Sequence, residues 1–225
     1  MADAEASEEP ELDARASDRL TTFSDAVVAI AITLLAIDLP VPVGQGVHHF
    51  WIAVRSDSGQ YLAFLISFVA IAGSWSQHHD LYRYVRGTDQ RMRTYHLAWL
   101  LGIILLPFAT KLLFSGHDSD LTVHALQWGF YALLQVLESA ALVAMVRRLV
   151  SRDMMEPHTP SRVISSVVGQ SWALILGFGL SIPVFFVTTN AWVLWILGPL
   201  LVRRARLLHH RRARRPPEPG PGCDG

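Results

Sequence analysis

Long apolar blocks separated by short polar connections dominate this sequence. The blocks cover residues 20–39, 60–79, 96–114, 121–146, 163–187 and 190–208. A helix of about 20 residues crosses the hydrocarbon core of a bilayer, which is ~30 Å thick. The fifth block contains Gly177, Gly179 and Pro183, which membrane helices tolerate when neighbouring groups satisfy the freed backbone atoms. The pattern predicts an all-α, polytopic membrane protein with six transmembrane helices.

Arginines are concentrated in alternate connections between these blocks. They precede the first block, separate the second from the third and the fourth from the fifth, and follow the sixth. The remaining connections contain only Arg55 and Lys111 as lysine or arginine. Connections rich in Lys and Arg stay on the cytoplasmic side of a membrane. The asymmetry therefore predicts that both termini are cytoplasmic and that the protein is a multi-pass protein of the inner or plasma membrane.

The two ends of the chain differ from its apolar middle. Residues 1–18 are acidic and polar, and residues 209–225 are basic and rich in proline. Both compositions are typical of disorder, so we expect a disordered head and tail around a six-helix domain over 19–208. Arginines that follow a last membrane helix usually serve topology and contact with anionic lipids. We therefore expect the lipid bilayer as a partner, and no nucleic acid.

Residues 40–59 predict a turn followed by a short helix outside the membrane. Four residues at the start are Pro or Gly, and the apolar run from Val47 to Val54 follows. Phe50 and Trp51 lie in that run, and aromatic side chains are enriched at the depth of the lipid head groups. We expect a short helix that lies in the membrane interface.

The first apolar block has two chemically different faces. At ~100° per residue, one side of a helix carries Ile30 together with Arg19, Phe23, Ala26, Thr33, Leu34 and Ile37, which fall within about 60° of it. Ser24 and Asp25 fall on the opposite side, near the start of the block. If the polar side faces the protein interior, the apolar stripe faces lipid, a packing partner or a pore, and the wheel alone leaves these three open.

Other ionisable residues within the blocks have ordinary structural explanations. His78, His79 and Asp80 are adjacent, but neighbouring side chains on a helix point about 100° apart and rarely bind one metal ion. We expect no metal there, but a buried polar network at a helix end. Glu138 lies in the fourth block, where an interhelical hydrogen bond is a commoner role than a proton relay.

The sequence contains no motif typical of an enzyme. A nucleophile elbow, a glycine-rich phosphate loop and paired catalytic carboxylates are all missing from it, so we expect no catalysis and no cofactor. A secondary transporter is one alternative, because Gly177, Gly179 and Pro183 could break a helix at the membrane midplane. A structural membrane protein is another, and a membrane enzyme would have to rely on His78, His79 and Asp80.

Several motifs in the first three blocks identify a family. They are Arg-x-x-x-Phe-Ser-Asp at 19–25, Ala-Ile-Ala-Ile-Thr-Leu-Leu at 29–35, Tyr-Leu-x-x-x-x-Ser-Phe at 61–68, Trp-x-x-His-His at 75–79 and Pro-Phe-x-Thr at 107–110. Together they resemble the first three helices of the prokaryotic transmembrane protein 175 family, whose members are potassium-permeable channels. The family often has Asn at the start of the third helix, where this chain has His96.

The resemblance implies a homotetramer in which the first helix of each subunit lines a central pore for K⁺. In that arrangement the apolar side chains of Ile30, Leu34 and Ile37 form the constriction, and Thr33 adds a ring of hydroxyls. Asp38 lies at the outer mouth. The resemblance also implies a polar network that holds the first helix against the next two. Its expected members are Arg19, Phe23, Ser24, Asp25, Trp75, His78, His79 and His96.

Overall fold

The computed structural model describes residues 2–43, 46–114, 120–198 and 204. Their secondary structure is helical, apart from a single isolated β-bridge in the described part of the chain. The helices are α1 (Ala2–Ile37), α2 (Val47–Ser56), α3 (Ser58–Tyr82), α4 (Gln90–Leu112), α5 (Leu121–Ser151), α6 (Ser161–Phe185) and the short 3₁₀ helix η1 (Thr189–Trp192).

Five helices in the described residues are long and apolar enough to cross a membrane. They are the segment Asp18–Ile37 of α1 and the whole of α3, α4, α5 and α6. The prediction of an all-α, multi-pass membrane protein is confirmed. Residues 199–203 and 205–208 of the sixth block, 190–208, and the whole tail at 209–225 lie outside the described residues, so the count of six and the position of the termini stay predictions.

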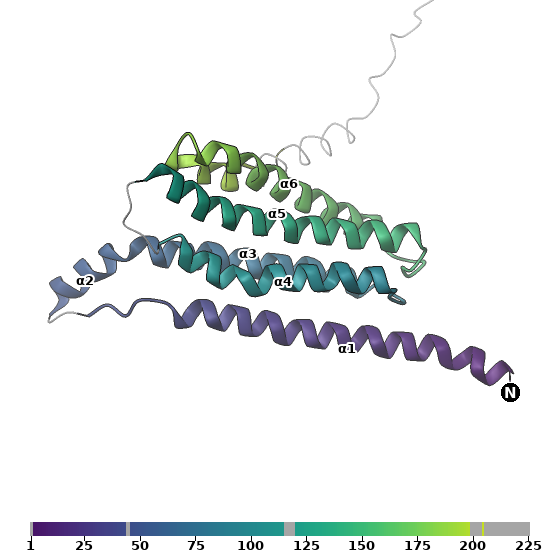
Figure 1. Cartoon of the computed structure of the whole chain (residues 1–225). Coiled ribbons are helices and arrows are strands. Elements are labelled where there is room, and N and C mark those ends of the chain that lie inside the picture. Colours follow the sequence, from purple (N-terminus) through teal and green to yellow (C-terminus); the bar gives the residue numbers. More distant parts are fainter. Residues whose placement is uncertain (1, 44–45, 115–119, 199–203, 205–225) are drawn as a thin grey trace, which may run out of the picture.

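The helices form layers, with α1 on one side (Figure 1). α1 lies along α3 and α4, and the pair α5 and α6 lies on the other side of these two helices. The side chains of Trp99 and Ile103 on α4 and of Tyr131 and Met145 on α5 are fully buried. Among the long helices, α1 contacts only α3 and α4, so it is attached to the rest of the subunit through one face.

Helix α4 begins at Gln90 rather than at residue 96, where the apolar block starts. The reason is an N-terminal helix cap, which hydropathy does not detect. The Asp89 side chain accepts a hydrogen bond from the Met92 backbone N–H at 2.8 Å, which satisfies a donor that the first helical turn leaves unpaired. Asp89 also pairs with Arg148 at the end of α5, so the cap joins α4 to α5.

Helix α1 starts at Ala2 and includes residues 2–17, where the sequence predicted a disordered head. Alanine and glutamate are frequent in this segment, and both favour helix formation. Helix α2, by contrast, was predicted, and its side chains, including Phe50 and Trp51, are exposed or half-buried. Its depth in the membrane interface stays a prediction.

The two arginine-rich connections meet at one end of the bundle. Val85 and Met155 form an isolated antiparallel bridge. The Arg86 N–H donates to the Met154 carbonyl at 3.0 Å, and the Glu156 N–H donates to the Tyr84 carbonyl at 2.9 Å. We call residues 84–86 and 154–156 the basic-end clasp. Because both connections lie at the same end, they lie on the same side of a membrane that the bundle crosses; that this side is cytoplasmic stays a prediction.

Candidate functional site

One face of α1 is buried against the subunit. Ser24, Val28, Ala31 and Leu35 are all at most 5% exposed, and their spacing places them on one side of the helix. This face packs on α3 and α4. The side of the helix that carries Ser24 is therefore turned toward the subunit interior.

The opposite face of α1 is exposed. Ile30, Leu34 and Ile37 are 59%, 45% and 78% exposed, and Thr33 is exposed beside them. The Thr33 hydroxyl donates to the Ile30 carbonyl at 2.8 Å, so its oxygen remains available as an acceptor on this face. We call these four residues the α1 stripe. It points away from its own subunit and is available to lipid or to another copy of the chain.

Ser24 is held by a buried pair of histidines. Its Oγ lies 2.7 Å from His96 Nε2 and also donates to the Leu20 carbonyl at 2.7 Å. Since the hydroxyl proton goes to that carbonyl, His96 Nε2–H is the donor to Ser24. His96 Nδ1 is then an acceptor with one lone pair, and it lies 2.8 Å from the Tyr82 hydroxyl and 3.1 Å from His78 Nε2. A continuous polar chain thus connects α1 through α4 to α3.

Aromatic rings enclose this polar chain. His78 stacks on Trp99 with ring centroids 4.1 Å apart and on Tyr82 at 4.2 Å. The Trp99 indole N–H donates to Ser74 at 2.9 Å. Sequence reasoning missed Tyr82, Trp99 and Ser74. Tyr82 and Trp99 could have been found from spacing, because Tyr82 follows His78 by one helical turn and Trp99 follows His96 by one turn.

A second contact holds α1 closer to the surface. The Trp75 indole N–H donates to Asp25 Oδ1 at 2.8 Å, and the His79 ring lies 5.4 Å from the Trp75 ring. The structure therefore brings six of the eight expected network residues to the faces of α1, α3 and α4 that meet. Arg19 and Phe23 are exposed instead, and the structure does not bring them into this cluster.

Asp38, expected at the outer mouth, lies at the end of α1 beside α4. Lys111 donates to its Oδ1 at 2.8 Å, and both side chains remain substantially exposed. The ion pair reduces the negative charge that Asp38 presents. As for metal binding, no three His, Cys, Asp or Glu side chains lie close enough together to hold an ion within the described residues.

Part of the first half of the chain matches a known protein family. Residues 19–107 match the family described as "Endosomal/lysosomal potassium channel TMEM175". This range includes α3, most of α4 and the apolar part of α1, and with them every residue of the α1 stripe and of the expected network. The matched family is described as one of channels and not of enzymes, in agreement with the expectation of no catalysis.

Individual relatives agree with this match. A potassium channel of Streptomyces collinus is 33% identical over 129 residues, covering 57% of this chain and 62% of that protein. A potassium channel of Chamaesiphon minutus is 37% identical over 97 residues, covering 42% and 48%. The endosomal/lysosomal proton channel TMEM175 of Gallus gallus is 36% identical over 103 residues, covering 42% and 21%. The chain thus spans less than two thirds of the length of these relatives.

The fold is similar over a longer range. The crystal structure of a lysosomal potassium-selective channel TMEM175 homologue from Chamaesiphon minutus superposes with a TM-score of 0.66 and 22% identity, covering 86% of this chain and 98% of that one. At this identity the likeness concerns the fold alone. The resemblance predicted from the sequence is confirmed: residues 19–107 of this chain match the TMEM175 family model, and the chain has the fold of a TMEM175 homologue.

Proposed function

We propose that this chain is a potassium-permeable cation channel of the cell membrane, a homotetramer whose pore is lined by the α1 stripe. The observation that carries the proposal is the two-sided character of α1. Its polar side is anchored to α3 and α4 through Ser24, whereas Ile30, Leu34 and Ile37 are exposed on the other side. The names of the relatives, which are those of potassium channels, support the same function.

The chemistry of the stripe determines how such a pore works. Four copies of Ile30 and Leu34 form apolar rings, which oppose wetting and require an ion to lose water without replacing it. Thr33 is the one hydroxyl on the stripe. Selectivity is therefore modest and favours K⁺ over Na⁺, because K⁺ loses its water more easily. The pairing of Asp38 with Lys111 makes the outer mouth less strongly negative than an unpaired carboxylate ring.

The continuity of the helices argues against a secondary transporter. That alternative rests on a broken helix near Gly177, Gly179 and Pro183, but α6 is a single helix from Ser161 to Phe185. Likewise, α4 continues past Pro107 to Leu112. Transporters of this kind place their substrate sites at interrupted helices, so a pore outside the subunit body suits this chain better.

Paired substitutions on α1 test the proposal. Ile30→Asn places hydrogen-bonding groups on the stripe, so we expect larger cation flux into liposomes and weaker preference for K⁺ over Na⁺. The control is Ile32→Asn, because Ile32 is half-buried and packs against the core. This control is expected to reduce the yield of folded protein without raising the flux per channel.

Two results would overturn the proposal. One is parental flux from both variants, or increased flux from the Ile32 variant alone, which would place the pore elsewhere. The other is a mass of the detergent-solubilised complex equal to that of one chain, because one copy of α1 cannot enclose a central pore.

A further inference from the structure

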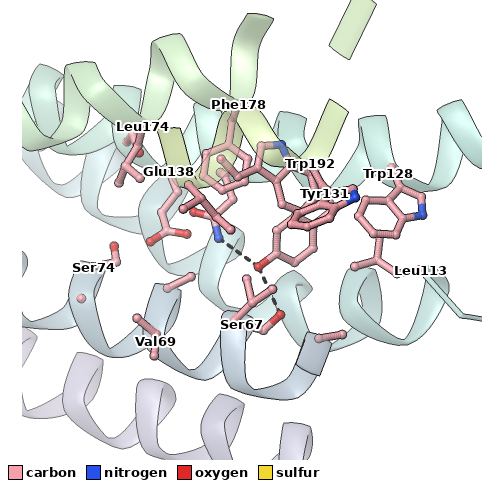
Figure 2. Close-up of a pocket in the computed structure, with 18 of the residues that line it drawn as sticks. Ser67, Val69, Ser74, Leu113, Trp128, Tyr131, Glu138, Leu174, Phe178 and Trp192 are labelled. Atoms are coloured by element: carbon pink, nitrogen blue, oxygen red, sulfur yellow. Dashed lines mark hydrogen bonds between the residues drawn. The ribbon is translucent and has the colours of Figure 1, made fainter. Parts of the chain in front are cut away.

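A cavity lies between α3, α5 and α6, on the side of α3 away from the α1 stripe (Figure 2). Its volume is about 500 Å³. On α3 its lining runs from Gly59 to Gln77, which is about 27 Å at 1.5 Å per residue. The shape suits one extended chain rather than a compact ligand.

Two residues that carry a buried, unpartnered acceptor atom line one end of this cavity. Glu138 is 2% exposed and Gln77 is 8% exposed, and within the described residues neither Glu138 Oε2 nor Gln77 Oε1 has a hydrogen-bond partner. Gln77 Nε2 donates to the Gly73 carbonyl at 3.3 Å, which fixes the amide. Figure 2 shows the Glu138 carboxyl reaching from α5 toward Ser74 on α3, and Gln77 follows Ser74 by about one turn.

The other end of the cavity is aromatic, and the Tyr131 hydroxyl and the Trp195 indole N–H there are already bonded. The Trp195 ring lies 5.1 Å from Tyr131, 4.9 Å from Phe178 and 5.5 Å from Trp128. The Tyr131 hydroxyl is bonded to Ser67 at 3.1 Å, as Figure 2 shows. This end therefore presents apolar surface, whereas the Glu138 end requires a hydrogen-bond donor.

We propose that this cavity binds a single-chain amphiphilic amine. Its ammonium group donates to Glu138 Oε2 and Gln77 Oε1, and its hydrocarbon chain lies along α3 toward Trp195. An ammonium has three donors and no acceptor, which matches two acceptors without donors. Its positive charge also compensates a carboxylate within a membrane helix, where an uncompensated charge is costly. The site lies inside one subunit, so its test does not depend on whether the proposed pore is correct.

Two other ligand types fit less well. A neutral alcohol has one hydroxyl donor and carries no charge to compensate Glu138. A single K⁺ ion binds oxygen ligands, but it leaves most of a cavity about 27 Å long without an occupant and makes no use of the rings around Trp195. The amine is the ligand whose two ends match the two ends of the cavity.

Tryptophan quenching provides a direct test, because Trp128, Trp192 and Trp195 line the cavity. The full chain in lipid nanodiscs is titrated with undecylamine that carries a bromine at its far end, since bromine quenches tryptophan fluorescence on contact. The corresponding bromoundecanol is the neutral control, and nanodiscs without protein correct for partition into lipid. We expect saturable quenching by the amine at concentrations about tenfold lower than by the alcohol, as a charge-assisted hydrogen bond predicts.

Three variants define the site. Glu138→Gln keeps the side-chain shape and removes the charge, so the amine is expected to bind no better than the alcohol. Glu156→Gln is the matched control, because it makes the same chemical change in the basic-end clasp. Gly73→Leu is expected to weaken both ligands, because Gly73 lines the cavity and a Cβ atom there meets nothing within 4 Å.

The results that would overturn the proposal are specific. Equal binding of amine and alcohol to the parent protein would leave only an apolar groove. Undiminished preference for the amine in the Glu138 variant would place the ammonium elsewhere, and no saturable quenching would mean no site. Competition by millimolar KCl at constant ionic strength would assign the acceptors to an inorganic ion. If the Glu138 variant does not fold, the titrations of the parent protein and of Gly73→Leu still test the proposal.

Discussion

The bond between Ser24 and His96 predicts the stability of the α1 attachment. Ser24→Ala removes the hydroxyl that His96 Nε2 contacts at 2.7 Å. Both residues are fully buried, so water does not replace the lost partner. His96 Nδ1 keeps its contacts with Tyr82 and His78, and therefore the substitution affects one nitrogen of the ring and leaves the rest of the polar chain in place.

The expected cost lies between two limits. Hydrogen bonds between membrane helices contribute on average about 0.6 kcal/mol in double-mutant cycles. Leaving a buried donor without a partner costs about 1–3 kcal/mol. Because the His96 donor has no access to water, we expect about 1–2 kcal/mol for Ser24→Ala. This corresponds to a decrease of roughly 5- to 30-fold in the ratio of folded to unfolded protein.

Thr22 provides a matched control on the same helix. The Thr22 hydroxyl also donates to the carbonyl of the residue four positions earlier, Asp18, at 2.9 Å, but the Thr22 side chain is exposed. Thr22→Ala is therefore expected to change stability by less than about 0.5 kcal/mol. The assay is reversible unfolding by dodecyl sulfate in mixed micelles, followed by circular dichroism.

A double-mutant cycle completes the test. In a His96→Leu background, Ser24→Ala is expected to cost less than about 0.5 kcal/mol, because the contact has already been removed. The reasoning is refuted if Ser24→Ala and Thr22→Ala have the same effect, or if the cost of Ser24→Ala is unchanged in the His96→Leu background.

Two further predictions concern packing and pH. Gly177→Ala is expected to destabilise the protein by about 1–3 kcal/mol, because its Cβ atom would lie 3.0 Å from the Leu194 carbonyl oxygen. The control Gly179→Ala should not destabilise it, because the added Cβ atom makes only an ordinary contact at 3.8 Å. Equal unfolding midpoints of the two variants would contradict the close approach at Gly177. The hydrogen bond from Arg148 lowers the pKa of Asp89 below its ordinary value, so the stability that this carboxylate contributes is present above about pH 4 and is lost as the pH falls further. The difference in unfolding free energy between the parent and Asp89→Asn should therefore shrink between pH 5 and pH 3, and a difference independent of pH would refute the pairing.

The hydropathy pattern predicted the positions of the membrane helices better than their ends. The second block, 60–79, lies within α3, but α4 starts before its block because Asp89 caps a polar first turn. Helix α5 likewise continues to Ser151, through a polar turn that hydropathy assigns to a connection. A cap and a few polar residues change the helix boundary without changing the mean hydropathy of the block.

The candidate site was predictable where one helix determines it. The helical wheel separated the exposed Ile30 from the buried Ser24, because both positions depend only on the helical period. The partners of His96 on other helices depend on how α3 and α4 cross, and this is a tertiary property that one sequence does not contain. For the same reason the sequence placed Glu138 in a membrane helix but could not reveal the cavity beside it.

The basic-end clasp lies at the end of the bundle opposite the connection between α4 and α5. Backbone hydrogen bonds in both directions join 84–86 to 154–156, whereas at the other end the chain itself joins α4 to α5. The α3–α4 hairpin and the α5–α6 hairpin are thus tied together at both ends. Breaking the clasp would leave the hairpins joined covalently at one end and by their packing and the Ser67–Tyr131 bond in between.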